Sequence, residues 1–299
     1  MKKLFFAFSA LFALSLLQAL SSAPPPNAAV ELTSAWEGNN LVYKTKNNDF
    51  CDYSIMVNLA STIGFDGPSS PYTGIVGRGE LKLFTLKWDG SGTGSSGFTY
   101  WTARGNIYEK PNVGFVYALP VKQGDSVRVA TKEGRDYTLS FDLTNASDTV
   151  YACRGGIVCD NSLADETSKG ASKYDRSDKI TVYHKDGTMA DYDIGKSFKS
   201  LVFPGNIVEM GDPIAVLKRT GATIKVISVG IYFLDRNKFN NTQTGSKYTG
   251  FVPVFHTTAG DMKLAPKTIY AGEITDQVAT GDMSKREKER YLKAKATKK

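Results

Sequence analysis

Short runs of alternating apolar and polar residues, separated by turns rich in glycine and asparagine, dominate this chain of 299 residues. Residues 41–45, 53–59 and 81–88 are three such runs, and a Gly/Ser-rich loop at 89–97 follows the third. Alternation with a period of two places successive side chains on opposite faces of a β-strand. Short strands at this spacing predict an all-β protein that begins with a β-sandwich over residues 30–116.

Strand-like runs continue after Pro120 and Gly124, where a second module begins. They span residues 126–130, 137–143, 149–153, 180–183, 214–217, 224–233 and 251–257. The polar and charged stretch 160–177 interrupts them, and we expect a loop insertion there. The segment after Ser284 is the one stretch that predicts a helix, so we expect a short basic helix in the C-terminal region.

The first residues have the features of a secretory signal peptide. A basic start, MKK, precedes an apolar run over residues 4–20, and the triplet SSA at 21–23 offers small residues for cleavage after Ala23. Residues 24–29 open with three prolines and predict a stiff, extended linker. These features predict an exported protein in the periplasm, at the cell surface or outside the cell. The alternative is that the apolar run is retained as a membrane anchor.

The net charge of +7 comes from the two ends of the chain. Residues 285–299 carry eight basic and two acidic side chains, Lys2 and Lys3 add two positive charges, and the remainder sums to −1. A body without a basic field, in an exported protein, argues against a nucleic-acid partner. We expect the basic end to be a solvated helix, and the alternative is electrostatic contact with an anionic envelope polymer or lipid.

Three cysteines, Cys51, Cys153 and Cys159, bear on the redox state of the protein. Export makes an oxidising compartment possible. Cys153 and Cys159 flank a strand–turn–strand pattern, and a three-residue loop would place them opposite each other. We therefore expect a Cys153–Cys159 disulfide and interpret Cys51 as a small buried hydrophobe.

Three segments of the second half resemble the lysostaphin-type (LytM-like) zinc endopeptidases that cleave peptidoglycan. Residues 149–158 (TVYACRGGIV) are similar to a strand–turn–strand motif of that family, residues 180–192 (ITVYHKDGTMADY) to its V-x-I-x-H-x-D-G-x-x-x-x-Y, and residues 205–215 (GNIVEMGDPIA) to G-D-x-V-x-x-G-Q-x-I-G. The resemblance implies a twisted antiparallel β domain of the duplicated hybrid motif type over residues 117–265 and a basic tail over 266–299. It also implies that the N-terminal sandwich is Ig-like, because such sandwiches are common companions in exported members.

The matching residues are those that shape the backbone. Asp186-Gly187 is a strong signal for a tight hairpin. We expect Gly156 and Gly187 to occupy turns that need a positive φ angle.

The residues that perform the family's chemistry do not match. The family binds zinc through a His and an Asp upstream of the V-Y-A strand and through the second His of a His-x-His motif, while two further His act on the attacking water. This chain has two His in total, His184 and His256, and none precedes position 184. Zinc hydrolysis needs three protein ligands and an open position for water. The resemblance therefore implies a degenerate member with no catalytic residue, no metal ligand and no zinc cofactor.

The resemblance also indicates which residues occupy the degenerate cleft. Ser140 stands at the position of the zinc-binding Asp, and Ile194 stands at the position of a catalytic His. Gly230 and Tyr232 replace the two His of His-x-His. The expected cleft is formed by Tyr137, Ser140, Asp142, His184, Tyr192, Ile194, Gly230 and Tyr232. We interpret His184 itself as a residue that flanks a turn, and His256 as structural or exposed.

Three functions are compatible with this pattern. The first is a non-catalytic envelope protein whose peptidase-like cleft binds peptidoglycan or a protein partner. The second is an active peptidoglycan endopeptidase with a rearranged metal site, which would need Asp142, His184 and Asp193 in one pocket. The third is a glycan-binding or adhesin-like structural protein, which would use the aromatic residues of the sandwich, Trp88, Tyr100 and Trp101.

Overall fold

A computed structural model describes residues 29–91, 96–130, 138–161, 179–195, 198–218, 225–240 and 246–297. The expected signal peptide, most of the expected linker, most of the 160–177 insertion and Tyr137 lie outside these ranges. Within the described ranges, no helix is long and apolar enough to cross a membrane.

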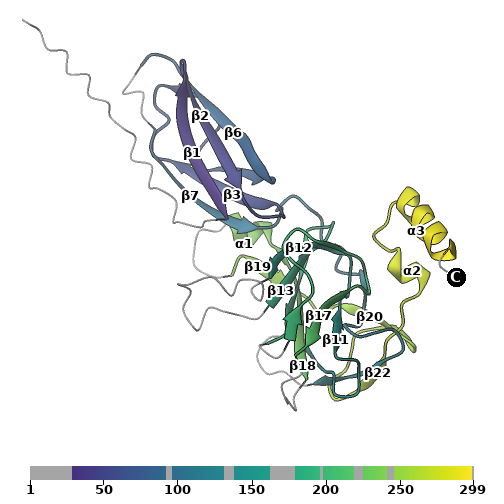
Figure 1. Ribbon diagram of the computed structural model, residues 1–299. Helices are drawn as coiled ribbons and strands as arrows, with labels where there is room; N and C mark the ends of the chain where they lie inside the picture. Colours follow the sequence, from purple (N-terminus) through teal and green to yellow (C-terminus); the bar gives the residue numbers. More distant parts are fainter. Residues whose placement is uncertain are drawn as a thin grey trace, which may run out of the picture.

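The N-terminal part is a sandwich of two antiparallel sheets (Figure 1). One sheet has the order β1-β2-β6-β4 and the other β5-β3-β7. The strands are β1 (Val30–Glu37), β2 (Asn40–Asn47), β3 (Tyr53–Leu59), β4 (Phe65–Asp66), β5 (Tyr72–Val76), β6 (Gly79–Trp88) and β7 (Phe98–Arg104). Tyr43 pairs with Phe84 in the β2–β6 register, and their rings stack with centroids 4.4 Å apart in the core between the sheets.

The second part is built on a nine-stranded sheet of order β16-β12-β13-β14-β18-β10-β9-β22, with β19 also paired to β18. Its strands are β9 (Ser126–Ala130), β10 (Thr138–Asp142), β12 (Gly156–Asn161), β13 (Lys179–Tyr183), β14 (Thr188–Asp193), β16 (Ile207–Val208), β18 (Val226–Leu234), β19 (Tyr248–Gly250) and β22 (Ile269–Ala271). We call this the large sheet.

Two three-stranded sheets belong to the same part, in the orders β11-β17-β15 and β21-β20-β8. They consist of β8 (Val116–Ala118), β11 (Thr149–Tyr151), β15 (Phe198–Ser200), β17 (Pro213–Leu217), β20 (Val254–Thr257) and β21 (Gly260–Met262). Phe141 of the large sheet meets Phe255 of β20 at 5.8 Å between ring centroids, and both are fully buried. One face of the large sheet therefore forms the core of the second part.

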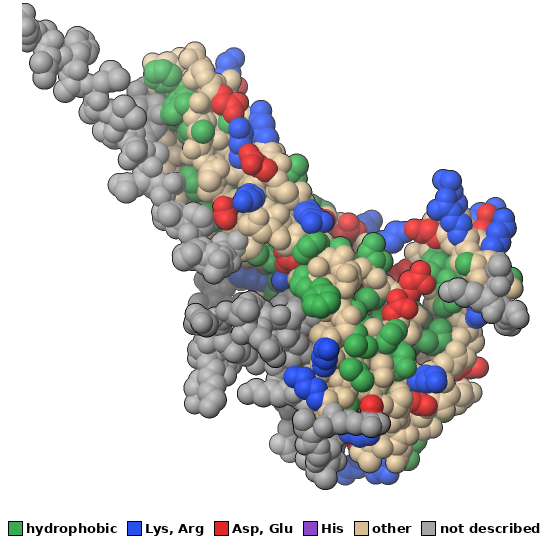
Figure 2. Space-filling view, viewed as in Figure 1, with side chains coloured by type: hydrophobic (Ala, Val, Ile, Leu, Met, Phe, Trp, Pro, Cys, Tyr) green, Lys and Arg blue, Asp and Glu red, His purple; other side chains and the backbone are tan. Residues whose placement is uncertain are grey.

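The expected all-β fold with a short C-terminal helix is confirmed. Helix α3 (Lys285–Thr297) is the expected basic helix, and it stands at the side of the second part (Figure 1). In the space-filling view, basic side chains gather on this helix, and apolar side chains gather on the visible face of the second part (Figure 2). Two further helices, α1 (Arg236–Asn240) and α2 (Asp276–Ala279), were not expected, because four or five residues are too few for helical periodicity.

The segment from residue 266 to residue 282 is part of the second domain rather than a separate tail. Strand β22 pairs with β9 in the large sheet, and Gly272 forms a bridge with Thr257. Further on, Asp282 forms an ion pair with the buried Arg154. The expected boundary at residue 265 therefore cuts through this domain.

The two domains share a hydrophobic core. The core cluster of the sandwich, which includes Tyr43, Ile55 and Val57, also contains Cys159 of the second domain. Ile157 of β12 and Tyr183 of β13 pack against the same cluster. The β12–β13 end of the large sheet thus completes the core of the sandwich.

The Cys153–Cys159 disulfide is not formed, and all three cysteines are free thiols. Strands β11 and β12 are not a hairpin, because β11 pairs with β17 while β12 pairs with β13 and β16. Cys153 lies in the core of the second domain, whereas Cys159 lies in the core shared with the sandwich. The pairing expected from the spacing is therefore wrong.

The two glycines singled out in the sequence have different structural reasons. Gly187 has a φ of 81°, as expected for the Asp186-Gly187 turn. Gly156 is not among the glycines with positive φ. It lies against the backbone of Tyr183, where a Cβ atom would overlap the carbonyl oxygen, so close approach of the two strands explains this glycine.

Candidate functional site

The face of the large sheet opposite the core carries rows of polar residues. In one row, the cross-strand register joins Lys179 of β13, Asp193 of β14, Ser228 of β18 and Ser140 of β10. The next row joins Thr181, Asp191, Gly230 and Thr138 in the same order of strands. Residues two apart in a strand share a face, so Tyr232 belongs with them. We call this set the polar face: Thr138, Ser140, Lys179, Thr181, Asp191, Asp193, Ser228, Gly230 and Tyr232.

Asp191 is the centre of a hydrogen-bond network on the polar face. Its Oδ1 accepts from Thr181 Oγ1 at 2.7 Å and from Tyr232 Oη at 2.8 Å, and its Oδ2 accepts from Lys179 Nζ at 3.1 Å. The pKa of Tyr232 is raised, mainly by burial and secondly by the negative charge of Asp191. The phenol therefore stays protonated and donates its hydrogen bond to Asp191. The side chains of Lys179 and Asp191 are 26% and 24% exposed, and Asp193 beside them is exposed. This side of the polar face can therefore meet a ligand.

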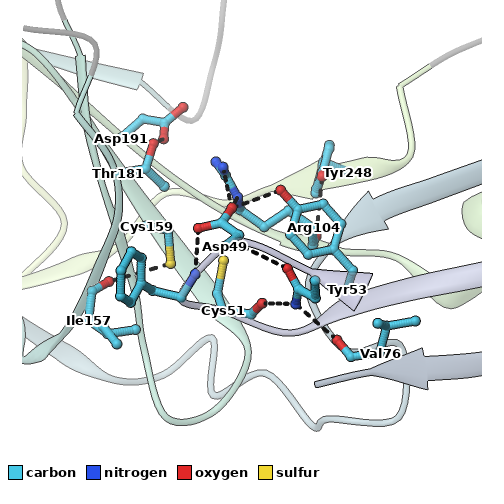
Figure 3. A network of polar contacts seen from close by, with 12 residues as sticks. Asp49, Cys51, Tyr53, Val76, Arg104, Ile157, Cys159, Thr181, Asp191 and Tyr248 are labelled. Carbon is cyan, nitrogen blue, oxygen red and sulfur yellow. Dashed lines mark hydrogen bonds and ion pairs between the residues drawn. The ribbon is translucent and has the colours of Figure 1, made fainter. Parts of the chain in front are cut away.

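The polar face continues into the junction with the sandwich (Figure 3). The rings of Tyr232 and Tyr248 meet edge to face at 5.3 Å, and Tyr248 Oη donates to the carbonyl oxygen of Arg104 at 3.2 Å. Arg104 in turn binds Asp49 through Nη2 at 2.7 Å and Nε at 3.1 Å. A chain of contacts thus connects Asp191 with the first domain.

Ser140 and Ser228 form the other side of the polar face. Their hydroxyl oxygens lie 2.9 Å apart, and both residues are buried. Zinc in proteins is held by imidazole, thiolate or carboxylate groups. The hydroxyls of Ser140 and Ser228 and the protonated phenol of Tyr232 belong to none of these classes, so this part of the face does not fit a zinc ion.

The structure brings together only part of the cleft expected from the sequence. Ser140, Gly230 and Tyr232 lie on the polar face. Asp142 ends β10 on the same side, and its Oδ1 accepts from the amide of Thr144 at 2.9 Å in a turn. Tyr137 lies outside the described residues.

Three residues of the expected cleft lie in the core, so their assignment to the cleft is wrong. Tyr192 is fully buried, and its Oη accepts from the Cys153 amide at 2.7 Å. Ile194 is 1% exposed. His184 is fully buried, with Nδ1 2.8 Å from the carbonyl oxygen of Gly155.

Asp191, the centre of the hydrogen-bond network, is not singled out by the sequence motifs. Strand β14 places Asp191 and Asp193 together on the polar face. The alternation in β14 contains the signal, because Ala190 and Tyr192 are apolar and face the core while Asp191 and Asp193 are polar. Alternation with a period of two therefore predicts that Tyr192 lies on the opposite face of the strand from Asp191 and Asp193.

Arg154, which follows Cys153 in the family-like segment, is the centre of a second polar cluster that lies in the core. Its guanidinium is fully buried and donates to Asp282, Asp186, Tyr117 and Thr188. The pKa of the neighbouring His184 is lowered to about 3. Burial is the main cause, and the positive charge of Arg154 is the second. His184 is therefore neutral at physiological pH, and its contacts agree with a structural role at the turn.

The rearranged metal site considered from the sequence is not assembled on the polar face. His184 lies in the core, away from Asp142 and Asp193, so the set needed for a rearranged metal site is not brought together. Among the described residues, the group of three potential ligands within reach of one ion is Asp49, Cys51 and Cys159, whose ligand atoms lie within 4.8 Å of one another. This group is at the domain junction.

The aromatic residues of the sandwich do not form one binding surface. Trp88 lies in β6 of the first sheet, where it meets Trp36 edge to face at 6.2 Å. Tyr100 and Trp101 are successive residues of β7 in the second sheet, so they point to opposite faces. His256 lies in β20, and its Nδ1 is 2.5 Å from Oδ1 of Asp261.

Comparison with known proteins gives distant structural likenesses. No protein-family model matches the chain, and no curated protein matches its sequence. The deep-sea M23 metalloprotease pseudoalterin is 16% identical, with 39% of this chain and 70% of that chain covered, at a TM-score of 0.27. Helicobacter pylori Csd3 in a hexagonal crystal is 13% identical, with 71% of this chain and 50% of that chain covered. Csd3 in an orthorhombic crystal is 10% identical, with 91% of this chain and 79% of that chain covered. Both have a TM-score of 0.27. The function is therefore inferred from the site itself.

Proposed function

We propose that this is an exported protein of the cell envelope, in which the second domain binds a peptide on the polar face without cleaving it. The peptide is a peptidoglycan stem or a segment of a protein partner. The observation that carries the proposal is the Asp191 network, which holds Lys179, Thr181 and Tyr232 in fixed positions on a rigid sheet. At the two positions that the family resemblance assigns to metal ligands, Ser140 and Tyr232, the side chains are hydroxyls.

The chemistry of the polar face suits a peptide with groups of both charges. Lys179 offers a partly exposed ammonium group for a carboxylate, and Asp193 offers an exposed carboxylate for an amine. Tyr232 and Tyr248 add aromatic surface with hydroxyl groups. Because these side chains come from strands of one sheet, little conformational freedom is lost when a ligand binds.

Export is proposed from the signal-peptide features of residues 1–23, and the periplasm or the cell surface is the proposed location. The basic helix α3 would then face anionic envelope polymers. Its side chains are mostly exposed, so they are available for this contact.

Binding is tested by calorimetric titration of the mature protein with soluble peptidoglycan stem peptides. We expect saturable binding that Asp191→Asn weakens by about tenfold, or about 1.4 kcal/mol, because this change removes the charge that holds Lys179 and Tyr232. Glu80→Gln is the matched control, since Glu80 is an exposed carboxylate of the sandwich, and it should bind like the wild type. Absence of saturable binding to stem peptides and to envelope protein extracts would refute the proposal.

Lack of cleavage is tested separately. The purified protein is incubated with peptidoglycan, soluble products are separated by chromatography, and bound zinc is measured by elemental analysis. We expect no products and less than about a tenth of an equivalent of zinc. A full equivalent of zinc together with released peptides would make the protein an endopeptidase and overturn the non-catalytic part of the proposal.

A further inference from the structure

Two cysteines from different domains face each other at the junction. Cys51 lies between β2 and β3 of the sandwich, and Cys159 lies in β12 of the second domain. They are 4% and 5% exposed and belong to the same core cluster. Their sulfur atoms and a carboxylate oxygen of Asp49 all lie within 4.8 Å of one another (Figure 3).

We propose that Cys51 and Cys159 are a redox-sensitive pair that forms a disulfide and thereby links the two domains covalently. The sequence spacing pointed to a different pair, because the contact between residues 51 and 159 depends on the packing of the two domains. A disulfide bond is about 2.05 Å long, so the two sulfur atoms must move closer together to form it.

The backbone around each cysteine supports this pairing. Register in the β12–β13 ladder shifts between Val158 and Asp160, which leaves Cys159 as the extra residue of a β-bulge. Val158 points into the core of the second domain, while Cys159 points into the core of the sandwich. On the other side, the carbonyl oxygen of Cys51 accepts from Asn47 Nδ2 at 3.0 Å, which fixes the backbone at that residue.

A metal ion is the competing occupant of this group, and the third ligand argues against it. Both oxygens of Asp49 already accept hydrogen bonds, Oδ1 from the amide of Phe50 and Oδ2 from Tyr53 and Arg104. The guanidinium of Arg104 would also repel a cation at this position. With Asp49 engaged in these contacts, the thiols of Cys51 and Cys159 are left as a pair, which favours a disulfide over a metal site.

The reaction is thiol–disulfide exchange with a disulfide-carrying oxidant, such as an oxidoreductase or oxidised glutathione. The thiolate of one cysteine attacks the oxidant's disulfide and forms a mixed disulfide, and the second cysteine then displaces the oxidant. Two protons and two electrons leave the protein, and the oxidant departs as a dithiol or as two thiols. Both thiols are buried, and the hydrogen bond to Cys159 together with burial raises the pKa of the Cys51 thiol. The exchange therefore requires an open junction, and the closed junction shields the product from reductants.

The test uses the full chain and counts free thiols. Protein refolded with oxidised glutathione is denatured, alkylated and mapped by non-reducing mass spectrometry, beside a sample kept reduced. We expect three alkylated cysteines in the reduced sample, and one, Cys153, in the oxidised sample, with a linked peptide that contains Cys51 and Cys159. Three alkylated cysteines after oxidation, or a link that involves Cys153, would overturn the proposal.

Variants and a metal titration complete the test. Cys153→Ser is the control that should retain the link, whereas Cys51→Ser and Cys159→Ser should each abolish it. The wild-type map decides the matter even where a variant fails to fold. Zinc is titrated into the reduced protein, and stoichiometric binding that Cys51→Ser abolishes would assign the pair to a metal instead. The result does not depend on the peptide-binding proposal, because neither cysteine lies on the polar face.

Discussion

Replacement of Arg154 by methionine tests whether the buried ion cluster stabilises the second domain. The guanidinium binds Asp282 through Nε at 2.5 Å and Nη2 at 2.7 Å, and it binds Asp186 through Nη1 at 3.1 Å. It also lies over the ring of Phe115, with Cζ 3.7 Å from the centroid. Methionine retains most of the apolar volume but leaves both carboxylates without their cation.

The size of the effect follows from the exposure of the two carboxylates. Removal of one partner from a buried ion pair costs about 3–5 kcal/mol, because the other charge stays buried. Asp186 is 15% exposed in its side chain and cannot regain full hydration, whereas Asp282 at 29% can recover part of it. We therefore expect a loss of about 3–4 kcal/mol in the free energy of unfolding, which corresponds to a fall of roughly 10 °C in Tm for a domain of this size.

The assay is unfolding in urea followed by far-ultraviolet circular dichroism. Tryptophan fluorescence gives a parallel record of the sandwich, because Trp36, Trp88 and Trp101 all lie there. Arg128→Met, at an exposed arginine of β9, is the matched control and should change stability by less than about 0.5 kcal/mol. A loss below about 1 kcal/mol for Arg154→Met would refute the reasoning.

Three further predictions concern single residues of the second domain and use the same urea unfolding assay. The folded-state pKa of His184, about 3, lies below its unfolded value of about 6.5, so stability is complete above pH 6.5 and is lost as pH falls toward 3. At pH 4.5 the free energy of unfolding should be about 2–3 kcal/mol lower, and His184→Gln should flatten its dependence on pH. An equally steep pH dependence in this variant would contradict the lowered pKa of His184. Gly156→Ala should cost about 1–3 kcal/mol because its Cβ would overlap the Tyr183 carbonyl, whereas Gly97→Ala, with an ordinary contact of 3.7 Å to Ala60, should be nearly neutral. Tyr192→Phe should cost about 1–3 kcal/mol because the Cys153 amide loses its acceptor, and the exposed Tyr108→Phe should not.

The fold was predictable where local alternation alone determines a strand. The runs at 53–59 and 126–130 coincide with β3 and β9, because in each the apolar side chains of one face enter a core. The C-terminal helix was also predictable from local sequence, because it is a continuous charged segment of 13 residues, long enough for more than three helical turns. Helices α1 and α2 were not, because each spans too few residues to show a period.

The candidate site was less predictable, since positions were carried over from a family motif. Ser140, Gly230 and Tyr232 reached the polar face, but Tyr192 did not, because β14 places its even-numbered residues toward the core. Ile194, which directly follows β14, also lies in the core. The contact between Tyr248 and Arg104 joins residues 144 apart in sequence. No local pattern encodes such a contact, and the same holds for the contact between Cys51 and Cys159.

The shared core at the junction has a consequence for the order in which the chain is made. Synthesis proceeds from the N-terminus, so the last strand of the sandwich, β7, is complete before Ile157 and Tyr183 leave the ribosome. Until those residues arrive, the sandwich presents an uncovered apolar surface that includes the region around Cys51. A chaperone that recognises nascent apolar segments would find its target here, and a chain truncated before β13 would retain this surface and aggregate.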